Sequence, residues 1–409
     1  MISDLARIGP AAAIFAVLTA VAGCSSPSEA IPPLWLGEQG DPLPATLQGG
    51  VFSVQVDVNG QPGPQVLVDT GAPFARLNVE AFGGAVPLGK GIVPSMSLGG
   101  TILWKVPTYG VSSGGSDAAS IDVQDGGIVG FSVFGQFPMS FNYRDASVVV
   151  GDPVLPSGLL DPFVFPMSLE GGGPGLLPDG SVTQLAPSRI ILTATIEGTP
   201  RILLLDTGAS SVALRSDVFQ AIASDGRPQT KSAVQLVTGG TNTDVLRLAN
   251  VSVGSAEVSG PLAVAGTGID DLLVGLTTEV GHQVDGLLGA PFLQHFFVTV
   301  DYPKRRLLLH PYTTETHIID EFHRVGILLR ALVGATTTNY SVLSVFSGTD
   351  AERQGVRVGQ SVLAIDGVPL GNVSPNDADR MLLGPVGSTH TLQFANRTLT
   401  LLVEELLPP

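Results

Sequence analysis

The chain has 409 residues, enough for two or three domains that each have a hydrophobic core. Its formal net charge of -16, from 20 Lys and Arg against 36 Asp and Glu, argues against a nucleic-acid partner. The single cysteine, Cys24, excludes an intramolecular disulfide framework and a zinc site built from several cysteines.

The first 24 residues are typical of an export signal. An apolar run at 11–23 follows a short stretch with one basic residue, Arg7, and it is too short and wrongly flanked for a membrane-spanning helix. Residues 21–24 (VAGC) resemble the lipobox of bacterial lipoproteins, in which the cysteine becomes the acylated N-terminus. The resemblance implies lipidation at Cys24 and an extracytoplasmic protein, anchored to a membrane at the periplasmic face or the surface of a bacterium. The alternative is an ordinary signal peptide or a simple anchor.

Residues 25–45 are rich in proline, and we expect them to form a tether. The first strand pattern follows, because apolar residues alternate from Phe52 to Val58 and are followed by Asn59-Gly60. This is typical of a hairpin with a two-residue turn. The apolar segment after the turn leads into residues 65–72 (QVLVDTGA), which contain Asp69.

The same pattern recurs later in the chain. A β-rich run at 190–196 precedes a turn, and residues 202–210 (ILLLDTGAS) then contain Asp206. In both copies a Leu and a Phe follow the aspartate by eight and thirteen residues, and a third pair of segments follows at 125–130 (DGGIVG) and 285–289 (DGLLG). The register indicates a duplication. The expected parts are two all-β lobes, 46–152 and 185–312, and a Gly- and Pro-rich loop between them, 153–184.

Two Asp-Thr-Gly segments, each after an apolar strand and each followed by a hydrophobic-hydrophobic-Gly element, resemble the aspartic proteases of the retropepsin-like branch. The resemblance covers both lobes and implies a mainly β, bilobal fold with Asp69 and Asp206 as the catalytic pair. Two carboxyl groups a few Å apart share one proton, so together they supply the base that activates water and the acid that protonates the carbonyl. We therefore expect no cofactor. A duplicated β scaffold with structural turns is the alternative.

The other positions of the motif have physical reasons. Gly71 and Gly208 allow the backbone to approach the carboxyl groups closely. In the family, the motif threonines, here Thr70 and Thr207, bond to the opposite lobe and fix the two loops.

The residue after each motif glycine is an alanine, Ala72 or Ala209. Pepsin-like enzymes usually have a hydroxyl residue there, which helps to stabilise the carboxylate. Without that hydrogen bond the pKa values of the pair should be less depressed. The sequence therefore predicts an optimum in mildly acid conditions.

The two lobes differ in length after the aspartate. To the glycine of the matching strand turn, Gly99 or Gly254, lobe one spends 30 residues and lobe two spends 48. The extra segment contains residues 237–244 (VTGGTNTD), which look like the hairpin that closes over substrate in this family. Lobe one lacks a counterpart, whereas pepsin-like enzymes carry their single flap on the N-terminal lobe. A surface hairpin without a role in catalysis is the alternative. The candidate flap residues are Gly239, Gly240 and Thr241.

After a linker, 313–322, we expect a third domain at 323–409. Residues 347–367 (SGTDAERQGVRVGQSVLAIDG) resemble a PDZ domain of the bacterial protease type, a small α/β fold. The resemblance implies a helix and turn at 351–355, a strand after Gly359 and a hairpin turn at 365–367. The loop that would capture a peptide C-terminus by strand addition comes before these elements. Its candidate residues are Val325, Gly326 and Ile327. The alternative is a domain that packs against lobe two and binds nothing.

We predict no metal site, since His310, His317 and His323 have no zinc-ligand spacing. The sequence as a whole predicts a lipid-anchored aspartic endopeptidase that acts on a peptide or protein substrate and uses its PDZ domain to recognise the substrate or a partner. Two other hypotheses stay open. One is a catalytically inactive peptide-binding lipoprotein, and the other is a protease active only as a homodimer formed through lobe two.

Overall fold

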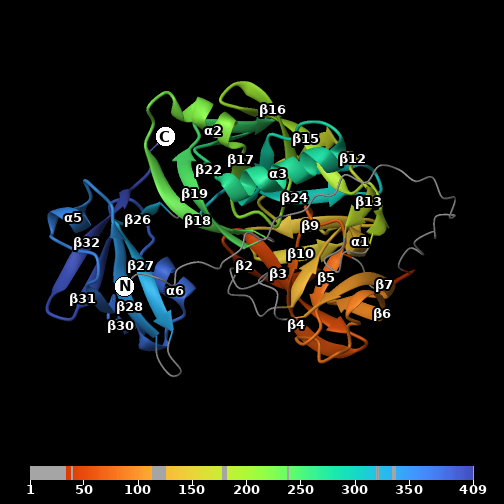
Figure 1. Cartoon of the computed structure of the whole chain (residues 1–409), viewed down its shortest axis with the longest axis horizontal. Helices are drawn as coiled ribbons and strands as arrows, with labels where there is room; N and C mark the ends of the chain where they lie inside the picture. The colour runs from red at the N-terminus through yellow and green to blue at the C-terminus, as the bar shows by residue number, and fades with distance from the viewer. Residues whose placement is uncertain are drawn as a thin grey trace, which may run out of the picture. The chain divides into compact units, whose positions relative to one another are not determined.

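The computed structural model of the chain is mainly β (Figure 1). Its strands form two lobes, which share one sheet, and a separate C-terminal domain. No helix in the part of the chain that is described is long and apolar enough to cross a bilayer. The described residues are 34–37, 40–112, 126–176, 182–236, 239–318, 320, 322–333 and 338–408.

Lobe one begins with the predicted hairpin. Asn59 and Gly60 both have positive φ angles, 52° and 73°, as a two-residue turn between twisted strands requires. Every second residue from Phe52 to Val58 is buried, so the alternation in the sequence marks the core face. The elements of lobe one are β1 (Leu34–Gly37), β2 (Pro42–Gln48), β3 (Val51–Val58), β4 (Gln61–Val68), β5 (Ala75–Asn78), β6 (Gly89–Leu98), β7 (Thr101–Val111), β8 (Gly127–Val129), α1 (Phe131–Phe134), β9 (Pro138–Asn142) and β10 (Ser147–Val150).

Lobe two repeats this plan, with Glu197 and Gly198 at its hairpin turn at φ 50° and 74°. Its elements are β15 (Arg189–Ile196), β16 (Thr199–Leu205), β17 (Val212–Leu214), α2 (Ser216–Ala223), β18 (Gln229–Leu236), β19 (Gly239–Arg247), β20 (Asn250–Val253), β21 (Ala256–Ser259), β22 (Leu262–Ala265), α3 (Thr267–Val280), β23 (Gly286–Leu288), α4 (Ala290–Leu293), β24 (Phe296–Asp301) and β25 (Arg306–Pro311). In each lobe the strand before the motif aspartate runs parallel to the strand of the hydrophobic-hydrophobic-Gly element, β4 to β8 and β16 to β23.

Equivalent strands of the two lobes pair with each other at the centre of one sheet. β9 of lobe one is antiparallel to β24 of lobe two, with β10 and β25 on their outer sides. The hydroxyl groups of Ser140 and Thr299 lie 2.8 Å apart across this junction, between buried apolar residues. The junction ties the two halves of the duplication together.

The predicted tether is partly structured, which corrects the expectation for residues 25–45. Strands β1 and β2 begin inside it, and β2 pairs with both β3 and β10. Leu43, Ala45 and Leu47 pack against the core of the lobes, and this alternation outweighs the neighbouring prolines. Lobe one therefore begins before residue 46.

The connection at 153–184 is also more than a loop. It contains β11 (Phe163–Pro166), β12 (Ser168–Glu170), β13 (Gly173–Leu176) and the start of β14 (Val182–Leu185). β11 adds to β25, and β12 adds to β15. Phe163 and Phe165 pack against the core, which explains why a Gly- and Pro-rich segment forms strands here.

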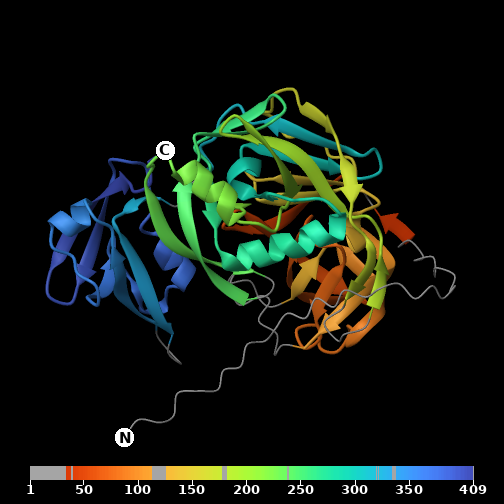
Figure 2. The same ribbon diagram turned by 45° about the horizontal axis from the view of Figure 1, so that its top comes forward.

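Lobe two carries a long hairpin, β18 and β19, which Figure 2 shows in green. The pairing explains the difference in length between the lobes. β6 pairs with β3 as β20 pairs with β15, and the turns after β6 and β20 hold Gly99 and Gly254. In the described part of lobe one, no hairpin equivalent to β18–β19 stands between β5 and β6.

The C-terminal domain is a sheet in the order β26-β32-β31-β29-β28-β27, with β30 paired to β29. The expected short helix and the hairpin turn are present, the latter with φ angles of 49° and 80° at Asp366 and Gly367. The elements are β26 (His323–Val325), β27 (Ile327–Val333), β28 (Thr338–Val345), α5 (Asp350–Arg353), β29 (Ser361–Ile365), β30 (Val368–Pro369), η1 (Leu370–Asn372), α6 (Pro375–Arg380), β31 (Thr389–Phe394) and β32 (Thr398–Glu405).

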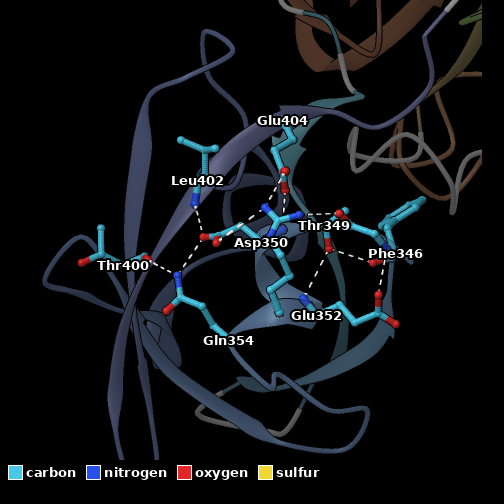
Figure 3. Close-up of polar contacts among 10 residues, drawn as sticks. Phe346, Thr349, Asp350, Glu352, Gln354, Thr400, Leu402 and Glu404 are labelled. Atoms are coloured by element: carbon cyan, nitrogen blue, oxygen red, sulfur yellow. Dashed lines mark hydrogen bonds and ion pairs between the residues drawn. The ribbon is translucent and has the colours of Figure 1, made fainter.

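Charge-assisted hydrogen bonds hold helix α5 against β32 (Figure 3). The carboxylate of Asp350 accepts from Leu402 N at 3.0 Å, and Glu404 pairs with Arg353 at 3.0 Å. The hydroxyl of Thr349 accepts from Glu352 N and caps the N-terminus of the helix. The short helix therefore has a fixed place in the domain.

Candidate active site

Each motif aspartate follows directly after a buried central strand. Asp69 N donates to Val129 O at 3.0 Å, and Asp206 N donates to Leu288 O at 3.1 Å. These bonds extend the parallel pairing of β4 with β8 and of β16 with β23 by one residue. The sheet thus fixes the backbone of both aspartates.

The threonines of the two loops bond across the lobes. Thr70 N donates to Thr207 Oγ1, and Thr207 N donates to Thr70 Oγ1, both at 3.0 Å. The hydroxyl groups in turn donate to Leu205 O at 3.1 Å and to Val68 O at 3.0 Å. Both threonines are fully buried. The four bonds hold the loops in one arrangement, as the family resemblance implies.

The motif glycines bring the two carboxyl groups together. A Cβ atom on Gly71 would lie 2.8 Å from Cγ of Asp206, and one on Gly208 would lie 2.6 Å from Cγ of Asp69. Each carboxyl group therefore packs against the loop of the opposite lobe, where only glycine leaves enough space. Each also accepts a bond within its own loop, from Gly71 N to Asp69 at 2.6 Å and from Gly208 N to Asp206 at 2.9 Å.

Burial raises the pKa of both aspartates. The negative charge of Asp69 raises the pKa of Asp206 further, whereas the hydrogen bonds from Asp206 and from Gly71 N lower that of Asp69. The pair therefore keeps one shared proton above the pH at which a solvated carboxyl group loses it. A carboxylate beside a carboxylic acid can accept one proton and donate another in the same step.

Asp206→Asn is expected to raise the melting temperature near neutral pH and to change it little below about pH 4. Because folding raises the pKa of Asp206 above its ordinary value of 3.8, the folded protein binds this proton more tightly than the unfolded chain. The resulting stability is fully present below the unfolded pKa and is lost as pH rises through the folded pKa. Asparagine has no such proton to lose. Calorimetry from about pH 4 to about pH 8 measures the difference.

The control for this measurement is Asp41→Asn, which changes an exposed carboxylate just before β2. It should not reproduce the pH-dependent gain. An equal gain for both variants at every pH would show that the pair holds no raised pKa.

Arg189, the first residue of β15, was not predicted from the sequence. One of its guanidinium nitrogens, Nη1, donates to Gly71 O in the opposite loop, and the others bond Glu279 of α3 at 2.7 and 2.8 Å. Its positive charge lowers the pKa of both Asp69 and Asp206. The available signal was a cation at the start of an otherwise uncharged strand (RIILTATI).

The predicted flap residues lie at the start of β19. Gly239, Gly240 and Thr241 pair with residues 236, 235 and 234 of β18. The hairpin is thus present where it was predicted, while the two residues at its tip, 237 and 238, lie outside the described residues. The contact of the tip with a substrate remains a prediction.

The predicted peptide-binding loop joins β26 to β27. Val325 and Ile327 are buried, and Val325 N already donates to Leu382 O at 3.0 Å. Gly326 is packed so closely against Thr349 that a Cβ atom would lie 2.3 Å from its hydroxyl oxygen. β27 stands at the edge of the sheet as described, and Cys24 lies outside the described residues.

The three histidines considered for a metal site make separate contacts. His310 lies in β25, with Nδ1 3.2 Å from Leu160 O, and His317 Nε2 lies 2.9 Å from Gln294 O. Among the residues of known placement, no group of three His, Cys, Asp or Glu side chains is arranged to hold a metal ion.

Residues 192–292 match the family model described as aspartyl protease. The match covers the loop of lobe two with Asp206, but not the loop of lobe one. No match was found among curated proteins. The family match and the mainly β fold together support a protease hydrolase.

Solved structures similar to this chain include two aspartic proteases. The aspartic proteinase from Irpex lacteus has 15% identity, covers 68% of this chain and 98% of its own, and has a TM-score of 0.43. A retropepsin-like aspartic protease from Rickettsia conorii has 18% identity, with 37% and 93% covered and a TM-score of 0.23. A photosystem II D1 C-terminal processing protease has 25% identity, with 21% and 24% covered and a TM-score of 0.19.

Proposed function

We propose that this chain is an aspartic endopeptidase in which Asp69 and Asp206 act as one catalytic pair. The proposal is based on one observation above all. The two motif loops come from different lobes, and each carboxyl group packs against the glycine of the opposite loop. This arrangement brings the two carboxyl groups together. One proton shared between them then costs less free energy than two adjacent negative charges.

In the proposed reaction, Asp69 as carboxylate takes a proton from a water molecule, whose oxygen attacks the peptide carbonyl carbon. Asp206, the protonated member of the pair in this scheme, donates its proton to the carbonyl oxygen. When the tetrahedral intermediate collapses, Asp69 gives its proton to the leaving nitrogen, the C–N bond breaks, and one hydroxyl group of the intermediate returns its proton to Asp206 as the C=O bond re-forms. The pair ends with one proton, as it began.

A single chain is favoured over a homodimer formed through lobe two. The four hydrogen bonds between Thr70 and Thr207 and their neighbours join two loops of the same chain. A lobe-two dimer would leave the loop of lobe one without a partner. Retention of both aspartates in this arrangement also favours catalysis over an inactive peptide-binding protein.

The test is cleavage of a peptide library by a soluble fragment that begins near Ser25, read by mass spectrometry. We expect internal cleavage that is blocked by a statine-type transition-state inhibitor, because its hydroxyl group occupies the place of the attacking water. A folded fragment that binds the inhibitor but cleaves no peptide would contradict the endopeptidase proposal.

The pH optimum is expected in mildly acid conditions. Ala72 and Ala209 supply no hydroxyl group to stabilise the carboxylates, and burial keeps the pKa values of the pair raised. The dependence of kcat/KM on pH measures this directly. A sharp optimum below about pH 3 would contradict the assignment.

We propose that the β18–β19 hairpin closes over the substrate. It occupies the extra length of lobe two, and Gly239 and Gly240 permit its tip to bend. Gly240→Ala should lower kcat/KM without lowering the melting temperature, because alanine restricts the backbone but keeps its N–H group. An unchanged kcat/KM would argue for a hairpin without a role in catalysis.

We propose that the C-terminal domain is a PDZ domain that recognises the substrate or a partner by adding a peptide strand to the edge of β27. The support is the order of its elements and the edge position of that strand. Because Val325 N is already bonded, the carboxylate would depend on other N–H groups of the loop. A library of free C-terminal peptides, with amidated peptides as controls, tests binding; equal affinity for both forms would oppose this mode.

We propose that the protein is exported and lipid-anchored through Cys24 and that it is extracytoplasmic. The support is the apolar run at 11–23 and the lipobox-like segment after it. Radiolabelled palmitate should enter the unaltered protein but not Cys24→Ala. Equal labelling of the two would oppose lipidation at Cys24.

A further inference from the structure

One arginine joins the loop of Asp69 to lobe two. Arg189 donates from Nη1 to the carbonyl of Gly71, the residue whose N–H bonds Asp69. Its other nitrogens form a bidentate pair with Glu279, and the side chains of Arg189 and Glu279 are 15% and 21% exposed. A mostly buried guanidinium with fixed partners holds the atoms that it binds in a defined place.

The duplication does not repeat this arginine. Ile191 pairs with Leu204 in lobe two, and Ser53 pairs with Leu67 in lobe one, so Val51 occupies the position that corresponds to Arg189. Val51 is buried and packs in a small apolar cluster. The pair of aspartates therefore has a cation on one side of the pseudo-symmetry and a hydrocarbon on the other.

The neighbouring residues determine where the Arg189 side chain lies and which acidic group pairs with it. Glu170 of β12 stands opposite Arg189 in the ladder, but its carboxylate bonds His282 at 2.5 Å. Glu279 from α3 is thus the acidic group that bonds the guanidinium. Gly171 leaves room for the pair, since a Cβ atom there would lie 2.9 Å from Glu279 Oε1.

We propose that Arg189 is a positioning residue for the aspartate pair: it holds the Gly71 carbonyl from the opposite lobe, and Glu279 limits the positive charge that it presents to Asp69 and Asp206. The inference rests on the proposed function. A cation near a carboxylate favours its ionised form, as the lowering of both aspartate pKa values by Arg189 indicates.

Two substitutions in the same ion pair should move the pH profile in opposite directions. Arg189→Met removes the cation, so the acid limb of kcat/KM should move up by about half a pH unit or more. Glu279→Gln leaves the cation without its counter-charge, so the acid limb should move down. If the ion pair were only structural, both variants would lose stability without opposite shifts.

Two further variants separate charge from packing. Arg189→Lys keeps the charge but cannot bind Gly71 O and Glu279 in the same fork, so kcat should fall while the acid limb stays near that of the unaltered protein. Arg227→Met is the matched control, because Arg227 is 12% exposed and pairs with Glu197 at 2.8 Å. Arg227→Met should lower the melting temperature without shifting the acid limb of the kcat/KM pH profile.

A second measurement needs no cleavage. The pH dependence of the melting temperature should change with Arg189→Met in the unaltered protein and much less in the Asp206→Asn background. The two variants Arg189→Met and Glu279→Gln could shift the pH dependence of the melting temperature in opposite directions in a protein that cleaves no peptide. That result would support the inference and oppose the proposed function. Cleavage with the same acid limb in both variants would overturn the inference alone.

Discussion

Asp69→Asn and Asp206→Asn are each expected to lower kcat/KM by about 10³-fold or more, since each removes one half of a pair that supplies both base and acid. Asparagine has nearly the shape of aspartate, and its Oδ1 can still accept the bond from Gly71 N or Gly208 N. The loss should therefore come from the missing proton transfer rather than from a displaced loop. Single-turnover cleavage of a selected peptide measures the effect.

Asp41→Asn should retain full activity and serves as the control, because Asp41 is exposed. If Asp206→Asn abolished cleavage and Asp69→Asn did not, the active form would be a lobe-two homodimer. Size-exclusion chromatography with activity measured across the peak would then show activity in the dimer fraction.

Thr207→Val is expected to lower the free energy of unfolding by about 2 to 4 kcal/mol and to abolish most activity. Valine has nearly the same shape but cannot accept from Thr70 N or donate to Val68 O, and all these groups are buried. Two backbone groups would then lack their partners, and the two loops would lose half of their mutual bonds. Urea denaturation measures the change in stability.

Thr207→Ser, which retains the hydroxyl group, is the matched variant and should recover most of the loss. If valine and serine destabilised the protein equally, the methyl group would be the important part of Thr207. The cross-lobe hydrogen bonds would then contribute little.

Local patterns predicted much of the fold. Asn59-Gly60 and the alternating valines before it identified a hairpin turn, and the repeated Asp-Thr-Gly segments identified the two loops that meet. These predictions depend on residues close in sequence or on a motif that occurs twice in the chain. Strands β1, β2, β11 and β12 were missed, because they lie in segments whose Gly- and Pro-rich composition is typical of loops, and their partner strands are distant in the sequence or recognisable only from the fold.

The charged groups around the aspartate pair could not be predicted from the sequence, for a different reason. Arg189 and Glu279 are 90 residues apart, and no spacing rule connects the first residue of a strand with a helix so far along the chain. Their contact exists because α3 and β15 belong to the same lobe fold. Similarly, the repeat could not show that Val51 replaces the arginine in lobe one, since the equivalence appears only in the strand pairing.

The close approach of each carboxyl group to the opposite glycine has an evolutionary consequence. After a gene duplication, two copies can usually drift apart independently. Here a side chain at Gly71 would collide with Asp206, and one at Gly208 would collide with Asp69, so each copy restricts what the other can accept. The two halves can diverge in their hairpins, helices and surface charges, but at these loops they must change together or not at all.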